Sequence, residues 1–346
     1  MMTNKQLIAL LPTLCIASVG NAQALYDDGT NKMDIYGRFE SQITTGDESI
    51  SEDGEWSGRM SARVGINLSR NLSAIEDSRV IGKSEWQVRT EGNDTRFDEG
   101  EDLQARYNYL GLEHDKFGSL VFGRTQSPMY QVMKMTDKYK NFTPGIYNYG
   151  LSKIDTSFSY NRQDATLLYS NNFDMHEIRA GYVLGNNEND VLDNGVLLSY
   201  RMNYKGDGFK ISPALAYSQY KRDSESTVTS KQHDQLMAGV ETNWNNFTFS
   251  IVADYVKIDM DGGSEDKYFG IDSLIAYKWG DFTFLGGYSF LDQDDEDTYE
   301  KEDWRVEGQW QLASKTYLSL TYDRELTTGN KDSEDDAVTF GLRYDF

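Results

Sequence analysis

The chain has 346 residues, a formal net charge of -22 at pH 7, 30 Gly, only 4 Pro and 1 Cys. A chain this acidic is not expected to bind nucleic acid, whose phosphates attract basic surfaces. The mean hydropathy of -0.65 excludes a bundle of membrane-spanning helices. It does not exclude a β-barrel, in which lipid-facing and lumen-facing side chains alternate and average to a polar composition.

The first segment has the pattern of a secretory signal peptide. Lys5 precedes the apolar run Leu7–Gly20, and the small-residue pattern Ala22-Gln23-Ala24 follows. The run is shorter than the ~18 apolar residues of a spanning helix. We predict cleavage after Ala24, with cleavage after Ala22 as the alternative, so that residues 1–24 are removed and residues 25–346 form the mature chain.

Apolar and polar residues alternate along most of the remaining chain, which is typical of strands with two different faces. In 304–312, Trp, Val, Gly, Trp and Leu alternate with Arg, Glu, Gln and Gln. Such charged residues do not fit the core of a soluble sandwich, whereas they suit a water-filled interior. The pattern predicts sixteen strands, near 33–43, 59–70, 78–90, 103–114, 118–125, 156–171, 176–185, 196–205, 208–220, 233–244, 246–258, 267–279, 281–291, 303–312, 315–325 and 337–346.

The connections between the predicted strands are of two kinds. Short ones, such as 244–247 and 279–281, are interspersed with long polar ones, such as 45–58 and 327–337. Short turns at one end, long loops at the other and an even strand number are typical of outer-membrane barrels. The alternative, a soluble all-β sandwich, would not need this asymmetry together with a signal peptide. We therefore predict a transmembrane 16-stranded antiparallel β-barrel.

The final residues, 338–346, read VTFGLRYDF and alternate up to Phe346. A closed barrel pairs its last strand with its first, which leaves no exposed edge. The segment 33–41, MDIYGRFES, is the expected partner. Phe346 is then expected in the aromatic girdle at the periplasmic end.

Three stretches of the chain resemble the general-diffusion porins of Gram-negative outer membranes. They are DGTNKMDIYGRFES at 28–41, LQARYNYLGLEHDKFGSLVFGRTQSPMY at 103–130, and the Phe-terminated last strand. The resemblance covers nearly the whole mature chain. It implies a homotrimer in the outer membrane, a third long loop that folds inward to narrow each pore, and a role for Phe346 in barrel assembly.

The longest break in the alternation, 125–153, lies where the resemblance places the constriction loop. A loop of this length in a compact domain is usually functional. In the family, a basic cluster on the barrel wall faces an acidic loop, and opposed charges across a narrow water path favour small hydrated solutes over large apolar ones. Carried over to this sequence, the basic side comprises Arg38, Arg63, Arg106, Arg162 and Arg124, and the loop side comprises Asp137, Asn141, Lys138 and Lys140.

The basic residues fit the predicted strands to different degrees. Arg38, Arg63 and Arg106 lie in phase with the polar face, as a lumen position requires. Arg162 shares its phase with the aromatic residues at 158 and 160. The alternative for each arginine is a solvated lumen residue without a special role.

The loop departs from the family pattern. Asp137 matches one acidic position, but Asn141 stands at the second, and Lys138 and Lys140 lie just before it. We therefore expect a smaller transverse field than an acidic loop would create.

The sequence offers no support for catalysis or metal binding. His114, His176 and His233 are isolated, without a companion at metal-ligand spacing. No nucleophile elbow, phosphate-binding glycine loop or His/Ser/Asp set is present. Cys15, the only cysteine, lies in the predicted signal peptide. We expect no enzymatic activity, no cofactor, no metal and no disulfide.

The predicted function is a passive channel for small hydrophilic solutes and ions, for which the acidic total favours a mild cation preference. A first alternative is a sugar-specific porin, in which aromatic residues such as Tyr139, Phe142, Tyr147 and Tyr149 form a sliding ladder. A second is a structural or adhesive barrel with a plugged lumen. The acidic loop 293–303 is interpreted as a solvated tip, with divalent-ion bridging to lipopolysaccharide phosphates as the alternative.

Overall fold

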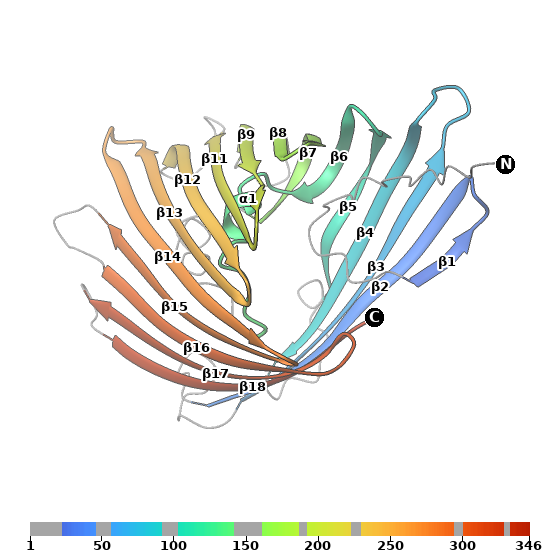
Figure 1. Ribbon diagram of the computed structural model, residues 1–346. Helices are drawn as coiled ribbons and strands as arrows, with labels where there is room; N and C mark the ends of the chain where they lie inside the picture. The colour runs from blue at the N-terminus through green and yellow to red at the C-terminus, as the bar shows by residue number, and fades with distance from the viewer. Residues whose placement is uncertain are drawn as a thin grey trace.

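The computed structural model describes residues 23–45, 57–91, 103–141, 161–186, 192–222, 230–293, 300–328 and 333–346. Its strands form a single antiparallel sheet that closes into a barrel (Figure 1). The described helix α1, Tyr130–Met133, lies inside the ring of strands (Figure 1). None of the helical residues described here forms a segment long and apolar enough to cross a membrane.

Sixteen of the eighteen strands form the wall, and two short strands extend it. β1 (Gln23–Asp27) pairs with β2, and β10 (Tyr204–Gly206) continues the line of β9 after Asn203. The wall strands are β2 (Asn31–Thr45), β3 (Ser57–Asn71), β4 (Ser78–Glu91), β5 (Leu103–His114), β6 (Gly118–Gln126), β7 (Arg162–Phe173), β8 (His176–Asn186), β9 (Leu192–Met202), β11 (Phe209–Lys221), β12 (Ser230–Trp244), β13 (Phe247–Met260), β14 (Glu265–Trp279), β15 (Phe282–Gln293), β16 (Glu300–Ala313), β17 (Thr316–Thr328) and β18 (Ser333–Asp345).

The barrel closes where β18 pairs with β2, from Val338 opposite Thr45 to Asp345 opposite Arg38. Beyond the strand, the Phe346 amide donates to the Gly37 carbonyl at 3.0 Å, and the Gly37 amide donates to the Phe346 carbonyl at 3.1 Å. The predicted pairing of the last strand with the segment 33–41 is therefore confirmed.

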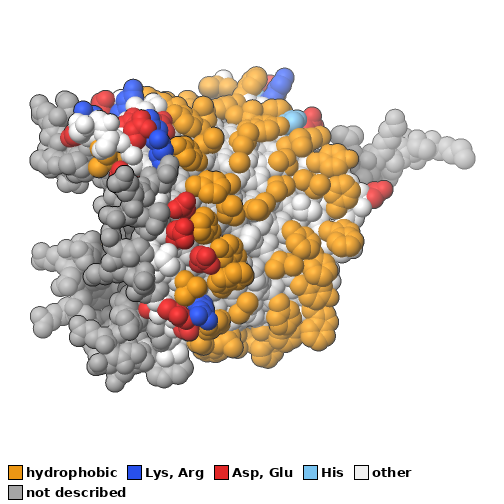
Figure 2. Space-filling view, turned by 90° about the vertical axis from the view of Figure 1, so that its left-hand side faces the viewer, with side chains coloured by type: hydrophobic (Ala, Val, Ile, Leu, Met, Phe, Trp, Pro, Cys, Tyr) orange, Lys and Arg blue, Asp and Glu red, His pale blue; other side chains and the backbone are white. Residues whose placement is uncertain are grey.

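The two faces of the wall differ in polarity, as the alternation predicts. On β16, Trp304, Val306 and Trp310 are exposed on the outside, while Arg305 and Glu307 are buried towards the lumen. Figure 2, seen from the side of the barrel that carries β14–β16, shows a broad band of hydrophobic side chains, with charged side chains gathered at one edge. An apolar outer belt around a polar interior is the arrangement that a lipid bilayer requires.

Aromatic residues gather at the end of the barrel where the turns are short. The turn between β14 and β15 has Trp279 and Phe282 in contact, with ring centroids 6.2 Å apart. Phe346 lies at the same end, because the amide of Asp345 bonds the carbonyl of Lys315 in the short turn between β16 and β17. Its ring stacks on Phe39, with centroids 6.0 Å apart.

Most predicted strands match the observed ones to within a few residues, and β7 is the main difference. It begins at Arg162 rather than at 156, and residues 156–160 lie outside the described part of the chain. Ala165 has a positive φ of 47°, so the regular alternation is broken near the start of this strand. The phase assigned to Arg162 from the sequence therefore does not apply.

Candidate functional site

The chain leaves the wall after Gln126 and turns into the barrel, so the predicted inward-folded loop is confirmed. An apolar cluster joins this loop to the inner face of β11, β12 and β13. It consists of Met129, Val132, Met133 and Met135 from the loop and Ala214, Ala216, Met237 and Val252 from the wall.

Gly239 on β12 makes this close approach possible. A Cβ atom at this position would lie 3.0 Å from both the Met135 sulfur and a Val132 methyl group. The apolar half of the loop is thus fitted against the wall rather than suspended in the lumen. Of the predicted loop 125–153, residues 142–153 lie outside the described residues.

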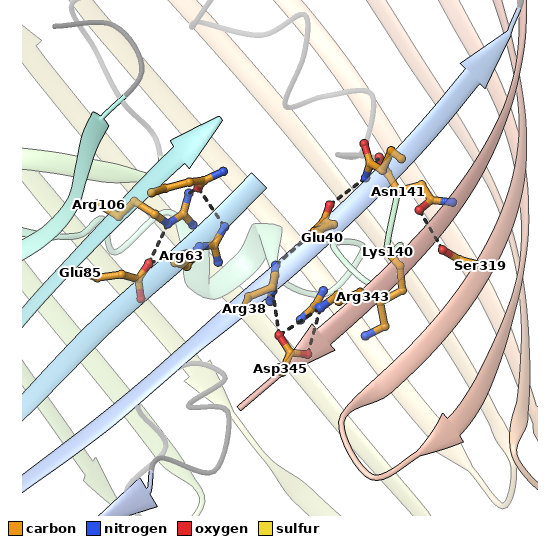
Figure 3. Close-up of polar contacts among 12 residues, drawn as sticks. Arg38, Glu40, Arg63, Glu85, Arg106, Lys140, Asn141, Ser319, Arg343 and Asp345 are labelled. Carbon is orange, nitrogen blue, oxygen red and sulfur yellow. Dashed lines mark hydrogen bonds and ion pairs between the residues drawn. The ribbon is translucent and has the colours of Figure 1, made fainter. Parts of the chain in front are cut away.

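Polar contacts attach the rest of the described loop to the wall. The Lys138 ammonium lies 2.6 Å from a carboxylate oxygen of Glu241 on β12. Glu307 on β16 accepts hydrogen bonds from the backbone amides of Lys140 and Asn141, at 2.8 and 3.3 Å. The Asn141 side chain accepts from Ser319 on β17 at 2.8 Å (Figure 3). The loop therefore follows the wall through a large part of its circumference, from β11 to β17.

Arginines from two neighbouring strands meet beside the end of the loop. Arg38 on β2 and Arg343 on β18 both bind Asp345, with Nε–O distances of 2.8 and 2.9 Å (Figure 3). Glu40 lies farther from Arg38, at 3.6 Å. Because β18 is the last strand and β2 the first in the wall, barrel closure itself assembles this group.

A second group is centred on Glu85 of β4. Its carboxylate accepts a hydrogen bond from Arg106 at 2.7 Å and one from the Tyr36 hydroxyl at 2.6 Å, and it lies 3.7 Å from Nε of Arg63. Gln87 accepts from both arginines, at 2.6 and 3.1 Å. One carboxylate and one amide therefore hold two guanidinium groups side by side (Figure 3).

Arg106 reaches this group through an irregularity in β5. It has the same parity along the strand as Leu110 and Leu112, which are exposed on the outer face, so the polar phase predicted for Arg106 is wrong. Tyr107 and Ala105 pair with consecutive residues of β4, so Arg106 is the extra residue of a bulge. A bulge re-aims a side chain, and here it turns Arg106 into the lumen.

Tyr107 supports two further cations. The Arg162 guanidinium lies 5.1 Å from the centre of its ring, and the Lys83 ammonium lies 4.3 Å from it. Both distances are within the range of a cation–π contact. Arg162 and Arg38 are also close enough to Arg63 to repel it, which joins the two groups into one basic surface.

Arg124 lies apart from this surface. It pairs with Asp164 at 2.5 Å, and that carboxylate is 55% exposed. Its neighbour across the ladder is Asn108, which lies on the outer face with Leu110. The structure therefore does not bring Arg124 together with the other predicted arginines.

On the loop side, Asp137 and Lys140 have opposite roles. The Tyr130 hydroxyl donates to Asp137 at 2.6 Å, and this contact together with burial raises the pKa of Tyr130. The Lys140 ammonium lies 4.5 Å from the centre of the Tyr317 ring. Within the described ranges, no carboxylate lies at ion-pair distance from it. The loop thus presents its ammonium towards Arg38 and Arg343, while its one carboxylate is already hydrogen bonded.

The comparisons with known proteins agree on one family. A family model described as "Gram-negative porin" matches residues 7–346. The chain belongs to the Gram-negative porin family. It is therefore an outer-membrane channel protein. It is 25% identical over 363 residues to "Porin-like protein L" of Photobacterium profundum, with 99% of this chain and 100% of that protein covered.

Solved structures show the same fold. The trimer form of OmpT from Vibrio cholerae matches this porin with a TM-score of 0.69 and 15% identity, over 92% of this chain and 100% of that one. The anion-selective porin from Comamonas acidovorans matches with a TM-score of 0.72 and 15% identity, over 91% of this chain and 100% of that one.

The sequence does not predict several residues of the basic surface and several of its counter-ions. Their only signal in the sequence is a position on the polar face of a predicted strand. Alternation shows that a side chain faces the lumen, but not at which height in the barrel or beside which neighbour. The missed residues are Tyr36, Lys83, Glu85, Asp345, Glu307 and Arg343.

The aromatic residues proposed for a sugar ladder are only partly described. Tyr139 is 8% exposed and packs against Leu274 and Leu285, with the Arg305 guanidinium 5.2 Å from the centre of its ring. Its ring is therefore not available to stack on a sugar. The others, at 142, 147 and 149, lie outside the described residues.

Within the described ranges, no three His, Cys, Asp or Glu side chains are arranged to hold a metal ion. Most of the acidic loop 293–303 lies outside those ranges, at residues 294–299.

Proposed function

We propose that this porin is a passive channel through which small hydrophilic solutes and ions diffuse across the outer membrane. The observation that carries the proposal is the arrangement of the constriction loop, whose described part is bonded along one side of the wall by Glu241 and Glu307. The arginines of β2, β3 and β5 line the other side. A charged passage between them admits hydrated solutes and makes the entry of large apolar molecules costly.

We further propose that the porin assembles as a homotrimer, by analogy with the trimer form of OmpT from Vibrio cholerae. The exposed apolar belt supports this assembly, because either lipid or another subunit must cover it. Native mass spectrometry of the detergent-extracted protein is expected to give three times the subunit mass. A monomer mass would contradict the trimer without affecting the channel.

Contact with lipopolysaccharide through divalent cations is a separate proposal, which rests on the acidic composition of 293–303. Chelation of divalent cations is expected to lower the thermal stability of the porin in lipopolysaccharide-containing membranes. The same treatment in phospholipid membranes should have no effect. Equal effects in both membranes would contradict the bridging.

Single-channel recording in a planar bilayer tests the channel proposal. Large ohmic steps that are indifferent to added oligosaccharides are expected. Block by one oligosaccharide at low concentration would favour a sugar-specific porin instead. The absence of any conductance from correctly folded protein would leave only a structural barrel.

A further inference from the structure

The charges around the passage are predominantly of one sign. Twelve charged side chains of the described residues are joined there by contacts or by direct electrostatic interaction. A field across the passage would need carboxylates on the loop side, but the loop contributes Lys140 and a hydrogen-bonded Asp137. The seven cations are Arg38, Arg63, Lys83, Arg106, Lys140, Arg162 and Arg343, and the five carboxylates are Glu40, Glu85, Asp137, Asp345 and Glu307.

Two of the five carboxylates, Glu85 and Glu307, are deeply buried. The side chain of Glu85 is 4% exposed, whereas those of Arg63 and Arg106 are 17% and 15% exposed. Glu307 is 3% exposed and lies behind the loop backbone that it binds. Beside Glu85, a solute in the water path therefore meets the guanidinium groups of Arg63 and Arg106 before it meets the carboxylate.

Other carboxylates of the inner wall are removed from the passage by the loop. Asp254 and Asp272 are each 4% exposed, and Asp303 is 2% exposed. Thr136 of the loop bonds Asp272, and Arg305 pairs with Asp303. Asp272 and Asp303 therefore belong to the contacts between the loop and the wall, and all three acids are buried away from the solute.

The sequence of the remaining loop cannot restore the balance. Residues 142–153 read FTPGIYNYGLSK and contain no Asp or Glu. Whatever their conformation, they cannot bring a carboxylate to face the arginines. The whole connection between β6 and β7, residues 127–161, contains four lysines and two acids, Asp137 and Asp155, so its net charge remains positive.

We propose that the constriction is a selectivity site for small anions, and that the porin passes carboxylates, phosphate and chloride in preference to cations of similar size. Arg38, Arg343 and Lys140 form the part of this site where β18, β2 and the loop meet (Figure 3). The inference rests on the proposed channel function. It runs against the net charge of -22, because selectivity depends on the local field at the narrowest point rather than on the total charge.

Substitutions of Lys140 test this inference, because its ammonium lies at the passage without a carboxylate partner among the described residues. Reversal potentials are measured across a potassium chloride gradient for the full-length porin and for Lys140→Gln, Lys140→Glu and Lys205→Glu. Lys205 is an exposed residue of β10 beside the short turn into β11, and it provides the matched charge-reversal control.

The unmodified porin and the Lys205→Glu control are expected to prefer chloride over potassium. Reversal of one charge at the constriction should lower the chloride-to-potassium permeability ratio by at least about twofold, with Lys140→Gln in between. Cation selectivity of the unmodified porin, or an unchanged ratio in Lys140→Glu, would overturn the inference while leaving the channel function intact. A folded porin that does not conduct would contradict the channel function and the inference with it.

Discussion

At the scale of single residues, the most informative side chain is Lys140. It lies between Glu307 on β16, Tyr317 on β17 and the Arg343–Asp345 pair on β18. Burial and the nearby arginines of β18 and β2 lower its pKa from the ordinary 10.5 to about 8. Desolvation is the largest cause, because a partly buried ammonium loses hydration without gaining a carboxylate partner among the described residues.

This lowered pKa predicts a pH-dependent selectivity. Lys140 is protonated below pH 8 and loses its charge as the pH rises through about 8, so the anion preference should fall between pH 7 and pH 9. Reversal potentials recorded at each pH measure the change. Lys140→Gln serves as the control and should show a flat profile over this range. An unmodified porin whose selectivity stays constant up to pH 10 would contradict the assignment.

Glu85 is the residue on which the arginine cluster depends for stability. Replacement by Gln removes the counter-charge of Arg63 and Arg106, and a buried charge that loses its partner is costly. We expect Glu85→Gln to lower the free energy of unfolding by about 1–3 kcal/mol, measured by urea titration. Glu40→Gln is the matched control and should have a smaller effect, because the Glu40 side chain is 18% exposed and lies 3.6 Å from its arginine. Equal effects would contradict this role of Glu85.

At the scale of elements, the loop is held by an apolar half and a polar half. The methionines of 129–135 pack on β11–β13, and the backbone around Lys140 and Asn141 bonds Glu307. The two halves act at different places along the wall. Loss of the polar contacts should therefore release the loop segment around Lys140 and Asn141, while the methionines of 129–135 remain packed on the wall.

Replacement of Glu307 by Ala tests this division. The amides of Lys140 and Asn141 lose their acceptor, so the loop should move more freely. We expect noisier single-channel currents and faster limited proteolysis within 134–153. Glu113→Ala provides a control, because Glu113 is a buried wall carboxylate that pairs with Arg79 instead of the loop. Quiet, protease-resistant channels in Glu307→Ala would contradict the role of this anchor.

At the scale of the whole molecule, closure joins the ends of the chain and creates part of the constriction. The pairing of β18 with β2 brings Arg343 and Asp345 beside Arg38. The contact is tight at Gly37, where a Cβ atom would overlap the Phe346 ring and the carbonyl of Arg63. A side chain at this position must therefore displace the terminal residue or the β2–β3 ladder.

This contact predicts an assembly defect in Gly37→Val. The folded fraction, measured by the heat-dependent shift in gel mobility, should fall several-fold, and Phe346→Ala should reduce it as well because the ring contact with Phe39 is lost. Gly308→Ala is the matched control, since a Cβ atom there meets nothing within 4 Å. Normal assembly of Gly37→Val would show that closure tolerates a displaced terminus.

The sequence predicts the strands of this porin well, because apolar and polar side chains alternate regularly along them. Alternation located the wall strands and the pairing of the terminal strand with β2, because register errors would place apolar residues in water. The resemblance, and not the alternation, predicts Arg106 in the lumen, because this residue shares the phase of the outward leucines and enters the lumen through a bulge. Alternation also does not single out Asp345, whose partners come from both ends of the chain. These features depend on ladder irregularities and on closure, which no local pattern records.

We propose that solutes pass through a water path that the loop narrows at Lys140. Because the only cysteine, Cys15, lies in the predicted signal peptide, thiol chemistry on a single introduced cysteine tests this claim directly. Lys140→Cys is recorded in a bilayer while a negatively charged thiol reagent is added, with Lys116→Cys in the short turn between β5 and β6 as the control. We expect stepwise loss of current in Lys140→Cys and an unchanged current in the control. An unaltered current in fully labelled Lys140→Cys protein would contradict it.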